Sequence, residues 1–244
     1  MVAAIIQARM GSSRFSGKSA RLLSGLSILE HIIIRLQQVP EINSIQLATT
    51  REKSEAPLIE IAKNRNILVF QGDEENVLER FIQAGDAIKA QHIVRVCGDN
   101  PLIDIPLLQS LVSAHIESHA DYTVSADPIP LGTGCEVIRL ETLKNIGKQT
   151  QDSKYREHVT TWFHDHYDKF KITRVNAPPY LKSCPFRLTV DTPEDFALME
   201  RIFSKNNPPY HIDLKSVIQF LESHPEIASI NSKIEQMDWR TKNQ

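Results

Sequence analysis

Apolar runs alternate with amphipathic stretches along the first half of the chain. Short apolar runs predict buried strands, and apolar residues repeated three and four positions apart predict helices that bury one face. The predicted strands cover residues 2–6, 45–49, 67–70, 92–96 and 122–125. The predicted helices cover residues 27–39, 55–65, 75–90 and 106–119. Ser27 and Glu30 have the spacing of a capping box, which marks the start of the first helix.

This repeated strand–helix order is typical of an α/β protein with helices on both faces of a sheet. We expect a Rossmann-like three-layer sandwich whose mixed sheet is mostly parallel. Right-handed crossovers place the loops that follow the strands at one edge of the sheet. Open α/β sheets bind their ligands at that edge, so the residues after each strand are the first candidates for function.

The second half of the chain is less regular. Its predicted strands cover residues 135–139, 171–175 and 187–190, and its predicted helices cover residues 141–147, 155–167, 193–203 and 214–224. No composition shift demands a domain boundary, so we expect a single domain over residues 1–244. Within it, residues 121–185 form a possible insertion that builds a substrate wall or a dimerisation arm.

Composition narrows the class of protein. The chain has 41% hydrophobic residues and a net charge of −2, so no global field favours nucleic acid or a membrane surface. No stretch approaches the roughly 18 apolar residues of a membrane span. Its three cysteines, Cys97, Cys135 and Cys184, are widely spaced, which indicates a reducing cytosol and not a disulfide framework. We therefore expect a cytoplasmic protein whose partners are neither nucleic acids nor membranes.

The segment after the first predicted strand, QARMGSSRFSGKS (residues 7–19), combines glycines, serines and three cations. Arg9, Arg14 and Lys18 can neutralise phosphate charges, and glycines let backbone amides approach phosphate oxygens. Such a donor set suits a triphosphate that loses pyrophosphate. The segment fits a P-loop poorly, because five residues, not four, separate Gly11 from Gly17. A P-loop and a solvated surface loop are the alternatives.

Two aspartates follow predicted strands that lie far apart in the sequence. Asp99 stands in CGDNP after residues 92–96, and Asp191 directly follows the predicted strand 187–190. If both strands belong to one sheet, these carboxylates converge on the ligand edge, where they suit Mg²⁺ together with phosphate oxygens. The alternatives are a turn residue for Asp99 and a helix N-cap for Asp191. Asp195 is a weaker candidate, because acidic residues are common in the first turn of a helix.

The motifs taken together resemble a known family. The segment IIQARMGSSRFSGK is similar to the opening of the cytidylyltransferases that include spore coat polysaccharide biosynthesis protein F, relatives of the acylneuraminate and KDO (3-deoxy-manno-octulosonate) cytidylyltransferases. The resemblance continues in order through LATT, VLERF, VRVCGDNPLID, REHVT and RLTVDTPEDF, over residues 2–203. It implies the nucleotide-diphospho-sugar transferase fold. Phe15-Ser16 replace the family's usual Leu-Pro, and Cys97 stands where KDO enzymes have Gln.

The resemblance also implies a reaction and a homodimer. A Mg²⁺-dependent cytidylyltransferase would transfer CMP from CTP to an acidic sugar, such as a nonulosonic acid, for surface polysaccharide or glycan synthesis, with release of pyrophosphate. The implied catalytic residues are Arg9, Arg14 and Lys18, and the implied metal ligands are Asp99 and Asp191. The implied nucleotide-binding residues are Gln7, Ala8, Gly11, Ser12, Ser13, Thr49 and Arg80. The implied acceptor-binding residues are Glu136, Arg156, Glu157 and His158, with surface or structural roles as alternatives.

Two other functions are compatible with the same fold. A glycosyltransferase that consumes a nucleotide sugar usually carries an Asp-x-Asp motif after a central strand, and GDNP has one aspartate there. A non-catalytic nucleotide-binding protein would be expected to lose the charged loop or an aspartate, and this chain retains both.

Overall fold

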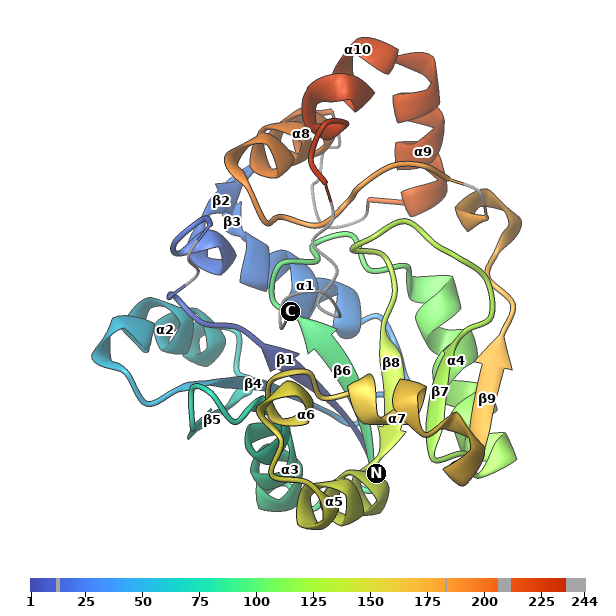
Figure 1. Ribbon diagram of the computed structural model, residues 1–244. Helices are drawn as coiled ribbons and strands as arrows, with labels where there is room; N and C mark the ends of the chain where they lie inside the picture. Colours follow the sequence, from blue (N-terminus) through green and yellow to red (C-terminus); the bar gives the residue numbers. More distant parts are fainter. Residues whose placement is uncertain (12–13, 183, 206–211, 236–244) are drawn as a thin grey trace.

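A seven-stranded sheet forms the centre of the molecule in a computed structural model that describes residues 1–11, 14–182, 184–205 and 212–235 (Figure 1). The strand order is β5-β4-β1-β6-β8-β7-β9. The strands are β1 (Val2–Gln7), β4 (Ser44–Thr50), β5 (Leu68–Gly72), β6 (His92–Cys97), β7 (Tyr122–Ser125), β8 (Glu136–Arg139) and β9 (Ile172–Val175). Only β8 among them runs antiparallel to its neighbours, β6 and β7. The mostly parallel mixed sheet expected from the sequence is confirmed.

Helices cover both faces of this sheet. The longer helices are α1 (Ile28–Leu36), α2 (Ala56–Asn64), α3 (Val77–Ala87), α4 (Ile105–Ser118), α5 (Leu140–Gln149), α8 (Pro193–Ser204) and α9 (Leu214–Ser223). The short elements are the β2–β3 hairpin (Leu22–Leu23 and Leu26–Ser27), α6 (Ser153–Glu157), α7 (Thr161–Asp165), α10 (Pro225–Ala228), and the 3-10 turns η1 (Lys18–Ala20), η2 (Lys53–Glu55), η3 (Tyr167–Lys169), η4 (Pro179–Leu181) and η5 (Ser229–Asn231).

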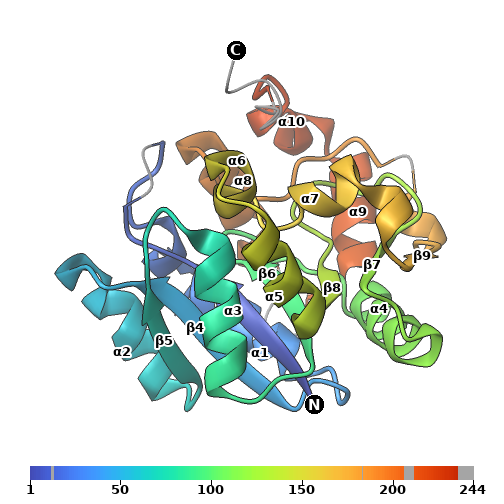
Figure 2. The ribbon, with the colours of Figure 1, turned by 60° about the horizontal axis from the view of Figure 1, so that its bottom comes forward.

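Strand β1 shows how the sheet divides the interior into two layers. Ala4 and Ile6 belong to the cluster under α1, α4 and α8, whereas Ala3 and Ile5 face the cluster under α3 and α5. Successive side chains of a strand point to opposite faces, so a fully apolar strand must be covered on both sides. Figure 2 shows α3 and α5 crossing one face of the sheet.

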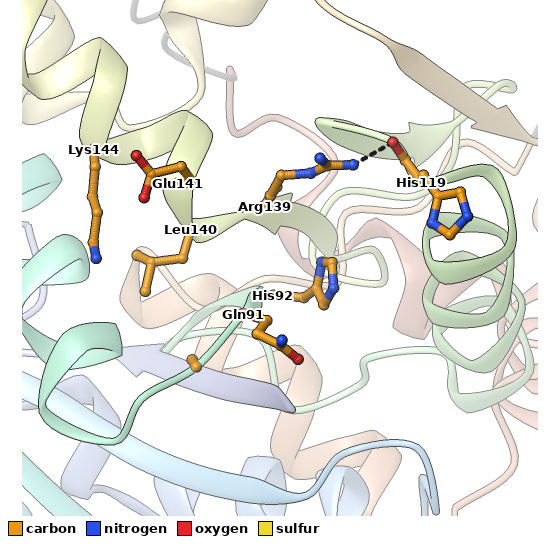
Figure 3. A pocket seen from close by; sticks show the side chains of 8 residues that line it. Gln91, His92, His119, Arg139, Leu140, Glu141 and Lys144 are labelled. Carbon is orange, nitrogen blue, oxygen red and sulfur yellow. Dashed lines mark hydrogen bonds between the residues drawn. The ribbon is translucent and has the colours of Figure 1, made fainter.

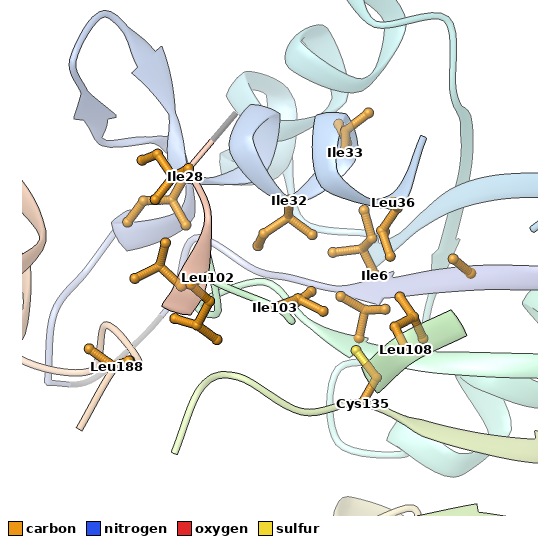
Figure 4. Packing of buried hydrophobic residues seen from close by; sticks show 14 of the residues in the cluster. Ile6, Ile28, Ile32, Ile33, Leu36, Leu102, Ile103, Leu108, Cys135 and Leu188 are labelled. Carbon is orange, nitrogen blue, oxygen red and sulfur yellow. The ribbon is translucent and has the colours of Figure 1, made fainter. Parts of the chain in front are cut away.

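The larger cluster joins distant parts of the chain. Figure 4 shows Ile28 and Ile32 of α1 packed near Leu102 and Ile103, which follow β6, and Leu188 closes the same cluster from the second half of the chain. All five side chains are fully buried. The predicted capping box of α1 is confirmed, with Ser27 Oγ accepting the backbone N–H of Glu30.

Two predicted elements are wrong. Residues 187–190 do not form a strand but make a single bridge between Arg187 and Leu131, because Leu188 and Val190 donate their N–H groups to the carbonyls of Leu131 and Asp99. The predicted helix 155–167 is divided into α6 and α7. The run Val159-Thr160-Thr161 lies at the break, and such β-branched residues lose side-chain freedom in a helix.

Residues 121–185 extend the central sheet, because β7, β8 and β9 all come from this segment. Their role as a substrate wall or dimerisation arm stays a prediction, as does the single domain over residues 1–244. In the part of the chain that the structure describes, none of the helices combines the length and apolar character needed to span a bilayer.

Candidate active site

Lys18 lies between the two aspartates singled out in the sequence. Its Nζ donates to Asp99 Oδ2 at 2.6 Å and to Asp191 Oδ1 at 2.7 Å. All three side chains are largely buried, with 12%, 22% and 13% of their surfaces exposed. Burial alone would lower the pKa of Lys18, but the two carboxylates raise it above its ordinary value. One buried cation therefore holds two acids together at the carboxyl edge of the sheet.

Close backbone contacts place Asp99. Gly98 donates its N–H to the carbonyl of Gln7 at 2.8 Å, and a Cβ at Gly98 would lie 2.5 Å from that of Ala8. Only glycine permits this approach of the two strand ends. The Asp99 carbonyl in turn accepts the N–H of Val190 at 2.9 Å. This last bond brings the residue before Asp191 beside Asp99.

Three cations surround Asp191. Lys18 and Arg14 approach Oδ1, Arg14 at 3.4 Å, and Arg187 donates to Oδ2 at 2.8 Å. Burial would raise the pKa of Asp191, but Lys18, Arg14 and Arg187 together lower it below its usual range. Asp191 is therefore a carboxylate with one oxygen held by Arg187 and the other directed to the cationic loop.

The loop of residues 8–18 is held at both described ends. Met10 donates its N–H to both carboxylate oxygens of Glu55 at 3.1 Å, and Gly17, at φ +68°, donates to the Met10 carbonyl. Phe15 packs against Phe196, their ring centroids 5.6 Å apart. The phenylalanine that replaces the family's leucine thus anchors the loop by packing.

Glu55 is a site residue that the sequence analysis missed. Its side chain is 2% exposed and also accepts the hydroxyl of Thr49 at 2.7 Å. Thr49, predicted to bind nucleotide, is fully buried and is linked to the loop through Glu55, which also accepts the Met10 N–H. The available signal was an acidic residue at the start of the predicted helix 55–65, which is the end of η2 in the structure.

The other predicted loop residues lie at several places. Arg9 pairs with Glu74 at 2.6 Å, Ala8 is buried, and Gly11 is exposed. Ser12 and Ser13 lie outside the described residues. The structure thus brings Lys18 to both aspartates and Arg14 to Asp191, and it pairs Arg9 with Glu74 in the β5–α3 loop.

A cavity of about 840 Å³ opens beside this loop. Predicted site residues from separate elements line it: Gln7, Arg9, Arg80, Arg156, Glu157 and His158. Arg80 is 1% exposed, and its guanidinium donates to the carbonyls of Asp73 and Glu74. Among the described residues, four of the five buried side-chain polar atoms without a partner belong to this lining: Gln7 Oε1 and the Nε atoms of Arg80, Arg95 and Arg156. Unpaired buried polar groups are costly and call for a partner.

A second cavity, of about 430 Å³, shares Arg95 and His158 with the first. Glu136 lines it and accepts Arg95 Nη1 at 2.8 Å as well as the hydroxyl of Tyr122. Burial, followed by the nearby Glu136 charge, raises the pKa of Tyr122 well above its ordinary value. Arg95 therefore lines both cavities, and the Glu136 carboxylate in the second cavity neutralises its charge.

Arg95 was missed by the sequence analysis, although a charged residue inside the apolar strand VRVC was a visible signal.

Other residues around the two cavities are largely engaged. Cys97 also lines the second cavity, and burial raises the pKa of its thiol. Arg156 Nη2 donates to Thr150 O and Gln151 Oε1, at 3.2 and 2.6 Å. Phe163 is fully buried and stacks on Tyr122 at 4.6 Å between ring centroids.

Another hollow, of about 490 Å³, lies at the opposite end of the sheet, around the start of β6. Figure 3 shows His92, His119 and Arg139 in its lining. The Arg139 guanidinium donates to the carbonyls of His119 and Ala120, so its charge is already engaged. This hollow is separate from the aspartates and the cationic loop.

Comparison with known proteins identifies the family of the chain. Residues 3–223 match the sequence profile described as Cytidylyltransferase. The chain belongs to the cytidylyltransferase family. The family is one of enzymes, so the protein is a nucleotidyltransferase, as the sequence resemblance predicted.

Relatives and solved structures extend over nearly the whole chain. An uncharacterised protein of Methanocaldococcus jannaschii is 35% identical, with 97% of this chain and 96% of that protein covered. The spore coat polysaccharide biosynthesis protein SpsF of Bacillus subtilis is 31% identical, with 92% and 95% covered. The structure of a cytidylyltransferase from Leptospira borgpetersenii has a TM-score of 0.88 at 26% identity, with 96% and 99% covered. A CTP complex of CMP-2-keto-3-deoxy-manno-octonic acid synthetase, at 16% identity and a TM-score of 0.64 over 84% of this chain and 98% of that one, shares the fold.

Proposed function

We propose that this cytidylyltransferase transfers CMP from CTP to an acidic sugar of the nonulosonic acid type and depends on Mg²⁺. The observation that carries the proposal is the contact of Lys18 with both Asp99 and Asp191. Two cavities that share Arg95 and His158 are lined by chain neighbours of this cluster, Arg9 in the first and Asn100 in the second. SpsF, a relative over 92% of this chain, is named for spore coat polysaccharide biosynthesis, which supports a role in surface polysaccharide or glycan synthesis.

The reaction joins the two substrates and releases pyrophosphate. A hydroxyl oxygen of the acceptor attacks the α-phosphorus of CTP, and the bond from that phosphorus to the oxygen bridging to the β-phosphate breaks. Pyrophosphate leaves with the electron pair, and the acceptor loses the hydroxyl proton. Reactions of this type depend on alignment and on charge neutralisation. In the proposed reaction Arg14 and Lys18, which contact Asp191, would hold the phosphates, and Arg9 lines the first cavity.

Asp99 and Asp191 suit a magnesium ion by the chemistry of their donors. Both are carboxylates that already share one cation, the Lys18 ammonium, through oxygens 2.6 and 2.7 Å from its Nζ. Hard oxygen ligands with room for phosphate oxygens are what Mg²⁺ prefers. When bound, the ion would neutralise charge on the phosphates. Lys18 would then move its ammonium from the carboxylates to the phosphates.

The acceptor fits best in the second cavity. Glu136, Ser125 and Thr160 offer polar groups for sugar hydroxyls, while Arg95 and His158 at the junction with the first cavity suit a carboxylate. This position puts an acceptor hydroxyl near the nucleotide. A homodimer in the cytoplasm is part of the proposal, and light scattering after gel filtration checks the oligomeric state.

Pyrophosphate release tests the proposal. CTP, UTP, ATP and GTP are each combined with a panel of acidic sugars, with Mg²⁺ present and then removed by chelation. We expect release with CTP only, dependent on Mg²⁺ and on an acidic acceptor. Asp191→Asn should abolish it, whereas the matched change Asp168→Asn, at an exposed aspartate in η3, should not. Hydrolysis of a nucleotide sugar without use of CTP would instead favour a glycosyltransferase.

A further inference from the structure

We propose that Asn231 is a positioning residue for Asp191, an inference that rests on the proposed catalytic role of Asp191. Asn231 ends the 3-10 turn η5 and is 3% exposed. Its Nδ2 donates to Asp195 Oδ1 at 2.8 Å and to the carbonyl of Arg187 at 3.0 Å. A side-chain amide has two N–H groups on that nitrogen, and here both are directed at the segment that carries Asp191.

Asp195 is the centre of this support. It is fully buried, and its carboxylate accepts from five groups. Arg187 Nε and Asn231 Nδ2 donate to Oδ1 at 2.9 and 2.8 Å. Arg187 Nη2 and the backbone N–H groups of Asp191 and Thr192 donate to Oδ2 at 3.1, 2.9 and 3.2 Å. A carboxylate has about four lone-pair sites for hydrogen bonds, so the five donors occupy all the accepting positions of Asp195. Asp195, weighed in the sequence as a metal ligand, is instead a support.

Two sets of hydrogen bonds connect Asp195 to Asp191. Asp195 accepts the backbone N–H of Asp191 directly. It also holds the Arg187 guanidinium, whose Nη2 donates to Asp191 Oδ2 at 2.8 Å. Together these contacts set both the main chain and the side-chain rotation of Asp191, and they leave Oδ1 toward Lys18. Groups that hold a metal-binding carboxylate in place commonly control its affinity for the ion.

Asn231 contributes uncharged hydrogen-bond donors, which the Arg187–Asp195 ion pair lacks. It supplies donors without charge, so it completes the hydrogen bonds of Asp195 and leaves the charge balance with Arg187 unchanged. It also comes from outside residues 3–223, the part that matches the family profile. In Figure 1 the helix just before it, α10, lies beside α8, which begins near Asp195. The C-terminal segment therefore completes the support of a residue in the proposed active site.

The test measures ion binding apart from turnover. Mn²⁺ is titrated into the full-length enzyme with a non-hydrolysable α,β-methylene CTP, and free Mn²⁺ is followed by electron paramagnetic resonance. We expect Asn231→Ala to weaken Mn²⁺ binding about tenfold, the lower end for such supporting groups. Asn231→Asp should weaken it further, because a second carboxylate would face Asp195. In turnover assays kcat should fall more than the acceptor KM changes.

Two further variants make the result specific. Ser232→Ala removes an exposed hydroxyl that donates to Ser229 in the same turn, and it should bind Mn²⁺ as the wild type does. Asn231→Ser keeps one donor and should restore part of the affinity if Asn231→Ala does not fold. Wild-type Mn²⁺ affinity in the Asn231 variants that fold, with or without lower thermal stability, would overturn the inference. Failure of the wild type to bind Mn²⁺, or unchanged binding by Asp191→Asn, would instead overturn the proposed function.

Discussion

Lys18 Nζ lies 2.7 Å from Asp191 Oδ1, and the same nitrogen lies 2.6 Å from Asp99 Oδ2. The two acids belong to distant parts of the sequence, and without a cation their buried charges would repel each other. The lysine therefore has a structural task in the free protein and, in the proposed reaction, a second one at the phosphates.

Replacing Lys18 should reveal both tasks. We expect Lys18→Met to lower kcat/KM at least ~100-fold, because a charge-stabilising group is lost. It should also lower the free energy of unfolding by about 2 kcal/mol, since two acids lose their shared partner. Urea unfolding with and without MgCl₂ measures the second effect, and Mg²⁺ should restore more stability to the variant than it adds to the wild type.

Lys63→Met, a change at an exposed lysine of α2, is the matched control and should alter neither quantity. Wild-type stability of Lys18→Met, with no added response to Mg²⁺, would contradict the place of Lys18 between the two carboxylates.

Glu136 holds Arg95 at the junction of the two cavities through a bond of 2.8 Å. Glu136→Gln should raise the acceptor KM about tenfold and leave the CTP KM nearly unchanged. A tenfold change corresponds roughly to the free energy of one hydrogen bond to a charged group. Tyr122→Phe removes the other donor to Glu136 without changing its charge and should have a smaller effect. Steady-state kinetics with each substrate varied in turn separates the two constants. A rise confined to the CTP KM would contradict the prediction, because it would mean that Glu136 acts on nucleotide binding and not on acceptor binding.

His115 makes stability depend on pH. It is fully buried, with His92 Nδ1 3.0 Å and Thr123 Oγ1 2.8 Å from its ring nitrogens. Burial, followed by the charges of His92 and Arg139, lowers the pKa of His115 to about 4. Between this value and the unfolded pKa of about 6.5, only the unfolded chain takes up the proton.

From about pH 7 to about pH 5, His115 should therefore remove about 2 kcal/mol from the free energy of unfolding. Urea unfolding at both pH values measures this loss. His115→Gln should reduce the loss by that amount, whereas His164→Gln, at an exposed histidine, should leave it unchanged. An equal pH dependence in all three proteins would show that His115 is protonated in the folded state.

Gly132 permits a close approach between the loop before β8 and residues 187–190. Its φ is +94°, and a Cβ there would lie 2.2 Å from the carbonyl oxygen of Leu188. Gly132→Ala should lower stability by about 3 kcal/mol or more and displace the segment that leads to Asp191. Gly25, at φ +87° in the β2–β3 turn, has open space around it. Gly25→Ala should therefore lower the free energy of unfolding by only about 1 kcal/mol. Thermal unfolding of both variants measures the two losses. Equal losses would mean that the contact with Leu188 adds nothing.

The sequence predicted most regular elements, because their signals are local. Apolar runs marked the buried strands, and Ser27 with Glu30 marked the start of α1 within one residue. The same local reasoning failed at residues 187–190, whose apolar alternation is that of a strand. Those residues bond to the loop at Leu131 and to Asp99 instead, and such partners have no signature in the local sequence.

The chemistry of the proposed site divides in the same way. The sequence by itself determined which residue types were available: a cationic loop after β1, an aspartate after β6 and another before α8. Only the tertiary structure decided that Lys18 lies between Asp99 and Asp191 and that the Asp195 carboxylate accepts from five donors. It also decided that Arg95 lines both cavities and that Asn231 donates to Asp195. Residue type and local pattern set secondary structure, whereas the meeting of distant side chains depends on packing over the whole sheet.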